Sequence, residues 1–183
     1  MLSRVLLAVA VALLLGGCAT VRAPAADPAF ESPYVLDAGD RLRVVVFGQE
    51  GLSNSYAVDG AGKIAMPLIG PVEARGKTTN ELSKSIGARL RAGFVREPHV
   101  AVEVETYRPF FILGEVIAGG QYAYVNNMTV ETAVAIAGGF SPRALKSYAT
   151  VGRAVDGLMV HATVPITYPL RPGDTVTIEE RWF

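Results

Sequence analysis

Few side chains in this sequence could carry chemistry, and they are scattered. Cys18 is the only cysteine, and the two histidines, His99 and His161, have no His, Cys or carboxylate partner at the spacing of a metal site. A catalytic site needs a nucleophile with a base, or a metal ion, within reach of the same reacting atoms. The sequence therefore predicts no catalytic residues, no metal ligands and no cofactor.

Two pairs of carboxylates could act as acid and base. Asp37 and Asp40 flank Gly39 in a predicted turn, where aspartate is favoured because its side chain accepts hydrogen bonds from the nearby backbone. Glu103 and Glu105 alternate with valines, which places both on the exposed face of a predicted strand. We interpret these pairs as turn and surface groups, with a glycosidase pair at the two glutamates as the minor alternative.

A short apolar run near the N-terminus predicts export and lipid attachment. Residues 5–15 are too few for the roughly 20 apolar residues of a membrane-spanning helix, but they are typical of a secretory signal. The run ends in Leu15-Gly16-Gly17-Cys18, which resembles the lipobox of bacterial lipoproteins. We predict a signal peptide over residues 1–17 and lipid attachment at Cys18, against the alternatives of an ordinary signal peptide or an uncleaved anchor. Ala19, in place of aspartate, favours the periplasmic face of the outer membrane.

The composition excludes one class of partner and indicates a folded chain. Lys plus Arg and Asp plus Glu each number 17, so the formal net charge is zero. Because nucleic-acid-binding proteins normally carry a basic excess, we predict no nucleic-acid partner. Half of the residues are apolar, which suffices for a packed core. Residues 18–32 are rich in Ala and Pro and are predicted to form a flexible tether.

The first predicted structural unit covers residues 33–106. Strands are expected over 41–47, 63–67, 70–74 and 100–104, from their β-branched and alternating residues. Thr78 and Glu81 form a capping box, which predicts a helix that starts at this point and ends near Gly93. Leu82, Ile86 and Leu90 then fall on one face of that helix, which is expected to be buried.

A second unit of similar size is predicted over residues 107–183. Strands are expected over 110–116 and around 148–154, 158–164 and 174–179. A short helix is expected over 129–137, and Gly138-Gly139 would close it as a glycine cap. The sequence thus predicts an α+β fold of two small units in tandem.

Several short motifs, in order, resemble those of a known family. The segment Tyr34-Val35-Leu36-Asp37-Ala38-Gly39-Asp40-Arg41-Leu42 resembles the opening of the polysaccharide biosynthesis/export domain. The second unit resembles a SLBB (soluble ligand-binding β-grasp) domain. The motifs that continue the match are Val46-Phe47-Gly48, Val58-Asp59-Gly60, Met66 to Gly70, Arg96 to Val100, Tyr107 to Phe110, Leu113 to Val116, Gly120-Gln121-Tyr122, Ala137 to Phe140 and Leu170 to Asp174.

This resemblance implies a function and a set of partners. The Wza-type outer-membrane polysaccharide export lipoproteins assemble as rings, octameric in the best-known case, around a passage in the periplasm. Residues 33–106 would be the polysaccharide biosynthesis/export domain and residues 107–183 a single β-grasp (SLBB) domain. The partners implied are further copies of the chain, the outer-membrane lipid, an inner-membrane polysaccharide co-polymerase and the polysaccharide in transit.

One departure from the longer family members bears on the partners. Those members end in an amphipathic helix that forms the pore through the outer membrane, whereas this sequence stops at Trp182-Phe183. Only helices and closed barrels cross lipid. The sequence therefore predicts a separate outer-membrane β-barrel protein that completes the conduit.

Candidate sugar-contacting residues are aromatic and amide side chains in the second unit, because sugars stack on rings and exchange hydrogen bonds through their hydroxyls. Their alternative roles are subunit packing or the core. Two competing functions remain: a lipoprotein that binds a small soluble ligand or glycan through its SLBB domain, and an accessory enzyme that acts on glycans. The candidates are Tyr107, Tyr122, Tyr124, Asn126, Asn127 and Tyr148.

Overall fold

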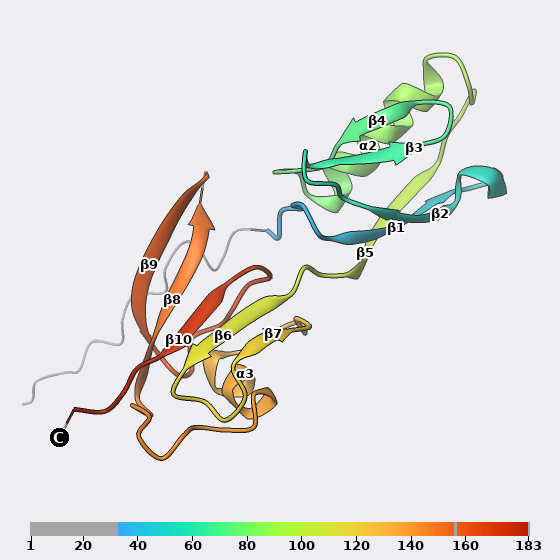
Figure 1. Ribbon diagram of the computed structural model, residues 1–183. Coiled ribbons are helices and arrows are strands. Elements are labelled where there is room, and N and C mark those ends of the chain that lie inside the picture. Colours follow the sequence, from blue (N-terminus) through green and yellow to red (C-terminus); the bar gives the residue numbers. More distant parts are fainter. Residues whose placement is uncertain (1–32, 156, 183) are drawn as a thin grey trace, which may run out of the picture. The chain divides into compact units, whose positions relative to one another are not determined.

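Two separate groups of buried apolar side chains organise the chain. The computed structural model describes residues 33–155 and 157–182; the predicted signal peptide, Cys18 and the tether lie outside them. One apolar group draws on residues 36–102 and the other on residues 110–178. We call residues 33–106 the N-terminal half and residues 107–182 the C-terminal half (Figure 1).

The N-terminal half is built on a three-stranded sheet with the order β2-β1-β5. Strand β1 (Arg41–Val46) pairs antiparallel with β2 (Asn54–Ala57) on one side and with β5 (Val100–Thr106) on the other. A short 3-10 helix, η3 (Glu50–Leu52), connects β1 to β2. Alternate residues of β1 are buried and exposed, as a strand with one face on the core requires.

A hairpin and a helix complete this half. The hairpin pairs β3 (Lys63–Met66) with β4 (Gly70–Glu73). The helix is α2 (Thr79–Arg91), and its predicted capping box is present: the Thr78 Oγ1 accepts from the Glu81 N–H, and Glu81 accepts from the Thr78 N–H at 2.8 Å. The predicted apolar face of α2 is fully buried. The helix ends at Arg91 with Ala92 as its cap, before Gly93.

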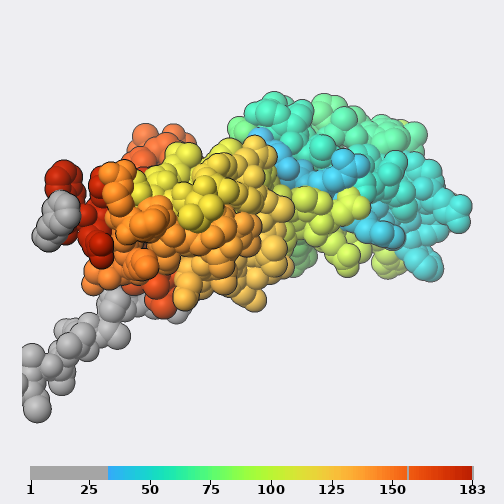
Figure 2. Space-filling model, turned by 60° about the horizontal axis from the view of Figure 1, so that its bottom comes forward, coloured from blue at the N-terminus to red at the C-terminus, as the bar shows by residue number. Residues whose placement is uncertain are grey.

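The C-terminal half is a five-stranded sheet with the order β7-β6-β10-β8-β9. Its strands are β6 (Phe110–Gly114), β7 (Gly120–Tyr122), β8 (Tyr148–Val155), β9 (Leu158–Pro165) and β10 (Thr175–Ile178). The central pair, β6 and β10, is parallel, and the other neighbours are antiparallel. Figure 2 shows α3 (Val130–Ile136) and the segment that follows it, coloured yellow to orange, covering one side of this half.

Helix α3 starts and ends where local signals place it. Thr129 and Thr132 form a reciprocal cap at its start. At its end, Gly139 has a φ of 100° and donates its N–H to the Val134 carbonyl at 2.9 Å, so the predicted glycine cap is confirmed. The described chain is therefore a sheet-rich α+β fold, and the predicted helix face is buried through Val130, Ala133, Val134 and Ala137.

A buried carboxyl group connects the two halves. The Asp40 side chain is fully buried and accepts hydrogen bonds from the Asp37 N–H at 2.9 Å, the Tyr34 hydroxyl at 2.6 Å and the Arg108 N–H at 3.0 Å. The Arg108 guanidinium adds an ion pair at 3.2 Å. Burial, reinforced by the hydrogen bond to Asp40, raises the pKa of Tyr34, so that its hydroxyl stays a neutral donor.

The C-terminal half repeats this turn with a second buried aspartate. Asp174 accepts from the Arg171 N–H at 2.8 Å and forms a bidentate pair with Arg153 at 2.8 and 2.7 Å. Gly173 before it has a φ of 87°, as Gly39 before Asp40 has 92°. The Arg108 side chain lies against both glycines: a Cβ at Gly39 would be 3.4 Å from the Arg108 Cβ, and one at Gly173 would be 2.8 Å from its Nε. Arg108 thus contacts both Gly-Asp turns.

Candidate functional site

The structure brings two of the predicted sugar-contacting residues together. Tyr107 lies edge-on to Tyr124, with ring centroids 5.6 Å apart, and edge-on to Tyr34 at 5.0 Å. The Tyr124 hydroxyl donates to the Leu170 carbonyl at 3.0 Å, and burial raises the pKa of Tyr124. All three rings are partly buried. These tyrosines pack at the junction of the two halves, and their contact with sugar stays a prediction.

The other four candidates do not gather with them. Tyr122 stacks on Phe110, with centroids 6.0 Å apart, and donates its hydroxyl to the Ala118 carbonyl. Tyr148 is half exposed at the start of β8. Asn126 and Asn127 are exposed in a turn, where Asn127 adopts a left-handed φ of 62°. Apart from Tyr122, these side chains remain accessible to a ligand.

The carboxylates and histidines form no common site. His99 precedes β5 in one half and His161 lies in β9 of the other, both exposed. No group of three or more His, Cys, Asp or Glu residues that could hold a metal occurs in the described part of the chain. The hydrogen bond from Ser55 and the guanidinium of Arg41 lower the pKa of Glu105. A glycosidase acid needs a raised pKa, so Glu105 is poorly suited to that role.

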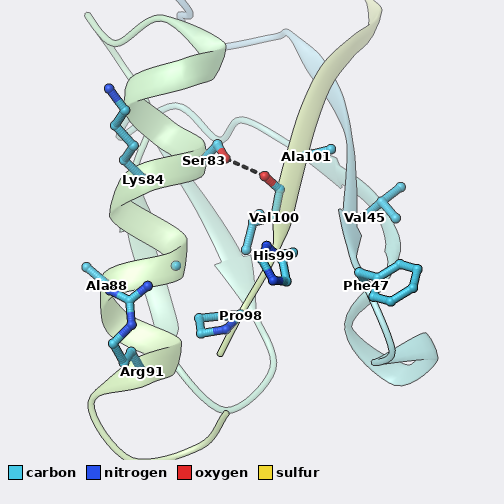
Figure 3. Close-up of a pocket in the computed structure, with 11 residues that line it drawn as sticks. Val45, Phe47, Ser83, Lys84, Ala88, Arg91, Pro98, His99, Val100 and Ala101 are labelled. Atoms are coloured by element: carbon cyan, nitrogen blue, oxygen red, sulfur yellow. Dashed lines mark hydrogen bonds between the residues drawn. The ribbon is translucent and has the colours of Figure 1, made fainter. Parts of the chain in front are cut away.

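Sequence reasoning missed a groove of about 570 Å³ between α2 and the edge strand β5. β5 pairs with β1 along one side only, which leaves its other edge toward α2. There the Ser83 hydroxyl donates to the Val100 carbonyl at 2.6 Å and holds helix and strand together (Figure 3). The lining residues are Val45, Phe47, Ser83, Lys84, Gly87, Ala88, Arg91, Pro98, His99, Val100 and Ala101.

Small residues make room for this groove. Gly87 is buried in the middle of α2, and a Cβ added there would lie 3.9 Å from the Pro98 carbonyl oxygen and from the Val100 side chain. A methyl group at this position would therefore make ordinary van der Waals contact with the strand. Ala88 and Ala101 contribute only methyl groups to the lining. The groove is open to solvent rather than enclosed, so it can take a ligand that extends beyond it.

The chemistry of the groove is basic on one side and apolar on the other. Lys84 and Arg91 are seven residues apart on α2 and share its exposed face. His99 lies on the segment that leads into β5 (Figure 3). Phe47, at the end of β1, is 78% exposed, and Val45 lies beside it in the lining. None of the described residues that line the groove is acidic. Such a surface can bind an anionic ligand that also presents apolar C–H groups.

Among residues 33–155 and 157–182, no helix combines the length and the apolar character that crossing a bilayer requires.

Comparison with known proteins assigns the N-terminal half. Residues 28–105 match the family described as polysaccharide biosynthesis/export protein, and this span contains every residue that lines the groove. The exopolysaccharide production protein ExoF of Rhizobium meliloti (strain 1021) is 34% identical over 133 residues, which cover 66% of this chain and 32% of the relative. The polysialic acid transport protein KpsD of Escherichia coli is 24% identical over 115 residues, which cover 62% and 21%.

The matched regions span about a third and about a fifth of the lengths of these two relatives. Family match and relatives agree on one assignment. Residues 28–105 are similar to the polysaccharide biosynthesis/export protein family, and both relatives are named for the production or transport of a polysaccharide.

Proposed function

We propose that this protein is a ring-forming periplasmic component of an outer-membrane polysaccharide export channel. The observation that carries the proposal is the family match of residues 28–105, supported by relatives named for exopolysaccharide production and polysialic acid transport. In this role the protein handles a polysaccharide in transit and works with the export machinery of the envelope, including an inner-membrane co-polymerase. It performs no catalysis.

The C-terminal half would be the β-grasp (SLBB) unit, with the domain boundary at residues 106 and 107. Its first and last strands, β6 and β10, lie parallel in the middle of the sheet, and α3 belongs to the crossover between them. Parallel neighbours need such a crossover. This arrangement is what a β-grasp unit requires and supports the proposal.

The strongest test is genetic. Deletion of the gene should abolish surface polysaccharide while precursors accumulate in the cell, and a plasmid copy should restore export. Normal secretion in the deletion strain would contradict the proposed function.

Membrane attachment would come from acyl chains on Cys18, which lies outside the described residues. Replacing Cys18 with serine removes the thiol that takes the lipid. The variant should therefore move from the outer-membrane fraction to the soluble periplasmic fraction, because two or more acyl chains are needed for stable anchoring. Fractionation followed by immunoblotting measures this. A Cys18→Ser protein that stays in the outer membrane would argue against lipidation.

Ring formation needs a surface that contacts the next copy, and the free end of the β8–β9 ribbon offers one. β10 pairs with β8 only over Thr150 to Gly152, whereas β8 and β9 remain paired as far as Val155 and Leu158. The apolar side chains beyond β10 are 44–71% exposed. Contiguous exposed apolar surface often marks a protein interface. They are Val155, Leu158, Met159 and Val160.

Charges placed on this ribbon should break the assembly. The double variant Leu158→Asp, Val160→Asp puts two carboxylates into the proposed contact, so native mass spectrometry in detergent should show monomers where the unmodified protein shows rings. Thr163→Asp, an exposed position of β9 nearer the sheet, is the control and should keep the ring. Unchanged assembly of the double variant would exclude the ribbon as the contact.

A further inference from the structure

We infer that the groove between α2 and β5 binds an acidic polysaccharide, with the sugar carboxylates on Lys84 and Arg91 and a sugar face against Phe47. This inference rests on the proposed function and names its substrate class. The groove lies wholly in the N-terminal half, and the tyrosines at the junction are not part of its lining.

The two cations are placed for a polymer rather than for a single small anion. Seven residues of α-helix advance about 10 Å along the axis, so the Lys84 and Arg91 side chains leave α2 about two turns apart. That distance is comparable to the repeat of a disaccharide in an extended glycan. In an extended chain with a carboxylate on every sugar or on every second sugar, two carboxylates one disaccharide apart can therefore bind at the same time, one at Lys84 and the other at Arg91.

The charge of Glu81 acts on Lys84, but Glu81 and Glu103 each also have a neighbour outside the groove lining. Glu81, one turn before Lys84 on α2, accepts from both the N–H and the hydroxyl of Thr78 in the capping box. Glu103 lies further along β5, where it is the cross-strand neighbour of Arg43. The groove lining itself carries Lys84 and Arg91 and no acidic side chain, and His99 adds a donor.

The apolar side of the groove fits the other face of a sugar. An exposed aromatic ring provides a flat surface for the C–H groups of a pyranose, and Phe47 is 78% exposed. The small residues Gly87, Ala88 and Ala101 leave space for the sugar rings between Phe47 and α2. Exposed charges and a single ring give weak binding, which a polymer in transit requires because tight binding would stop it.

The test uses two probes that differ only in charge. Purified full-length protein is titrated with polygalacturonate oligosaccharides and with the same oligosaccharides after methyl esterification, with binding followed by isothermal calorimetry. The charged probe should bind at least about tenfold more tightly. The double variant Lys84→Ala, Arg91→Ala should lose the preference for the charged probe. Phe47→Ala should bind both probes more weakly but should keep the preference for the charged one. The single variant Arg91→Ala should bind the charged probe more weakly, whereas the conservative variant Arg91→Lys should keep most of the affinity.

A matched control variant distinguishes binding in the groove from a general effect of positive charge on the protein surface. Lys146→Ala, Arg181→Ala removes two exposed cations from the C-terminal half and should leave the titration unchanged. Equal affinity for both probes, an equal loss in this control, or binding of a second copy of the chain at the groove in place of sugar would overturn the inference. These outcomes differ from failure of the proposed function, which is read from secretion in the deletion strain.

Discussion

Replacing Asp40 with alanine is expected to lower the free energy of unfolding by about 3–5 kcal/mol, because it leaves the Arg108 guanidinium without its buried partner. Asp40 is fully buried, and it accepts hydrogen bonds from the backbone of Asp37 and of Arg108 as well as from Tyr34. The substitution removes the acceptor of all these donors at once. Buried donors without an acceptor are costly.

Urea unfolding, followed by circular dichroism, measures this effect. Glu73→Ala is the control, since Glu73 pairs with Lys63 at 3.1 Å but both side chains are substantially exposed; its loss should stay below about 1 kcal/mol. A double-mutant cycle with Arg108→Ala isolates the pairwise energy. Equal effects of Asp40→Ala and Glu73→Ala would show that the junction contributes little to stability.

Gly114→Ala should be at least as damaging to the C-terminal half. Gly114 has a φ of 84°, and it sits opposite Ile178 in the parallel pair of β6 and β10. An added Cβ would overlap the carbonyl oxygen of Ile178, which accepts from the Glu115 N–H. The two central strands would have to separate, so we expect a loss of more than about 4 kcal/mol.

Gly48→Ala separates backbone strain from this overlap. Gly48 has a similar φ of 72°, but nothing lies within 4 Å of the position that its Cβ would take. Its cost should be about 1–2 kcal/mol, the strain of a left-handed residue alone. Thermal unfolding of both variants gives the comparison. A Gly114→Ala protein as stable as Gly48→Ala would mean that β6 and β10 adjust without loss.

The parts of the fold that the sequence predicted are those with local causes. The capping box at Thr78 and Glu81, the glycine cap after α3 and the alternation in β1 and β5 each depend on residues within one element. Strand positions were therefore close to the observed ones. The 3-10 helix η3 was missed, because three residues carry too little signal.

The groove and the surroundings of the buried aspartates depend on contacts between residues far apart in the sequence, which no local pattern predicts. Asp40 was correctly interpreted as a turn residue, but its partner Arg108 lies 68 positions away. The strand predicted over 41–47 placed Phe47 at its end, but no local pattern placed Phe47 near Lys84 and Arg91. That they line one groove follows only from the pairing of β1 with β5 and the packing of α2.

The position of Arg108 also affects how the chain can be divided into fragments. A fragment that ends at Thr106 would contain Asp40 but neither the amide nor the guanidinium that neutralises it, while a complementary fragment that starts at Tyr107 would keep Arg108 beside Gly173 with no acid to meet it. An N-terminal polypeptide that extends through Arg108 keeps the ion pair with Asp40, so the sequence boundary between the halves does not coincide with the boundary of this charge network.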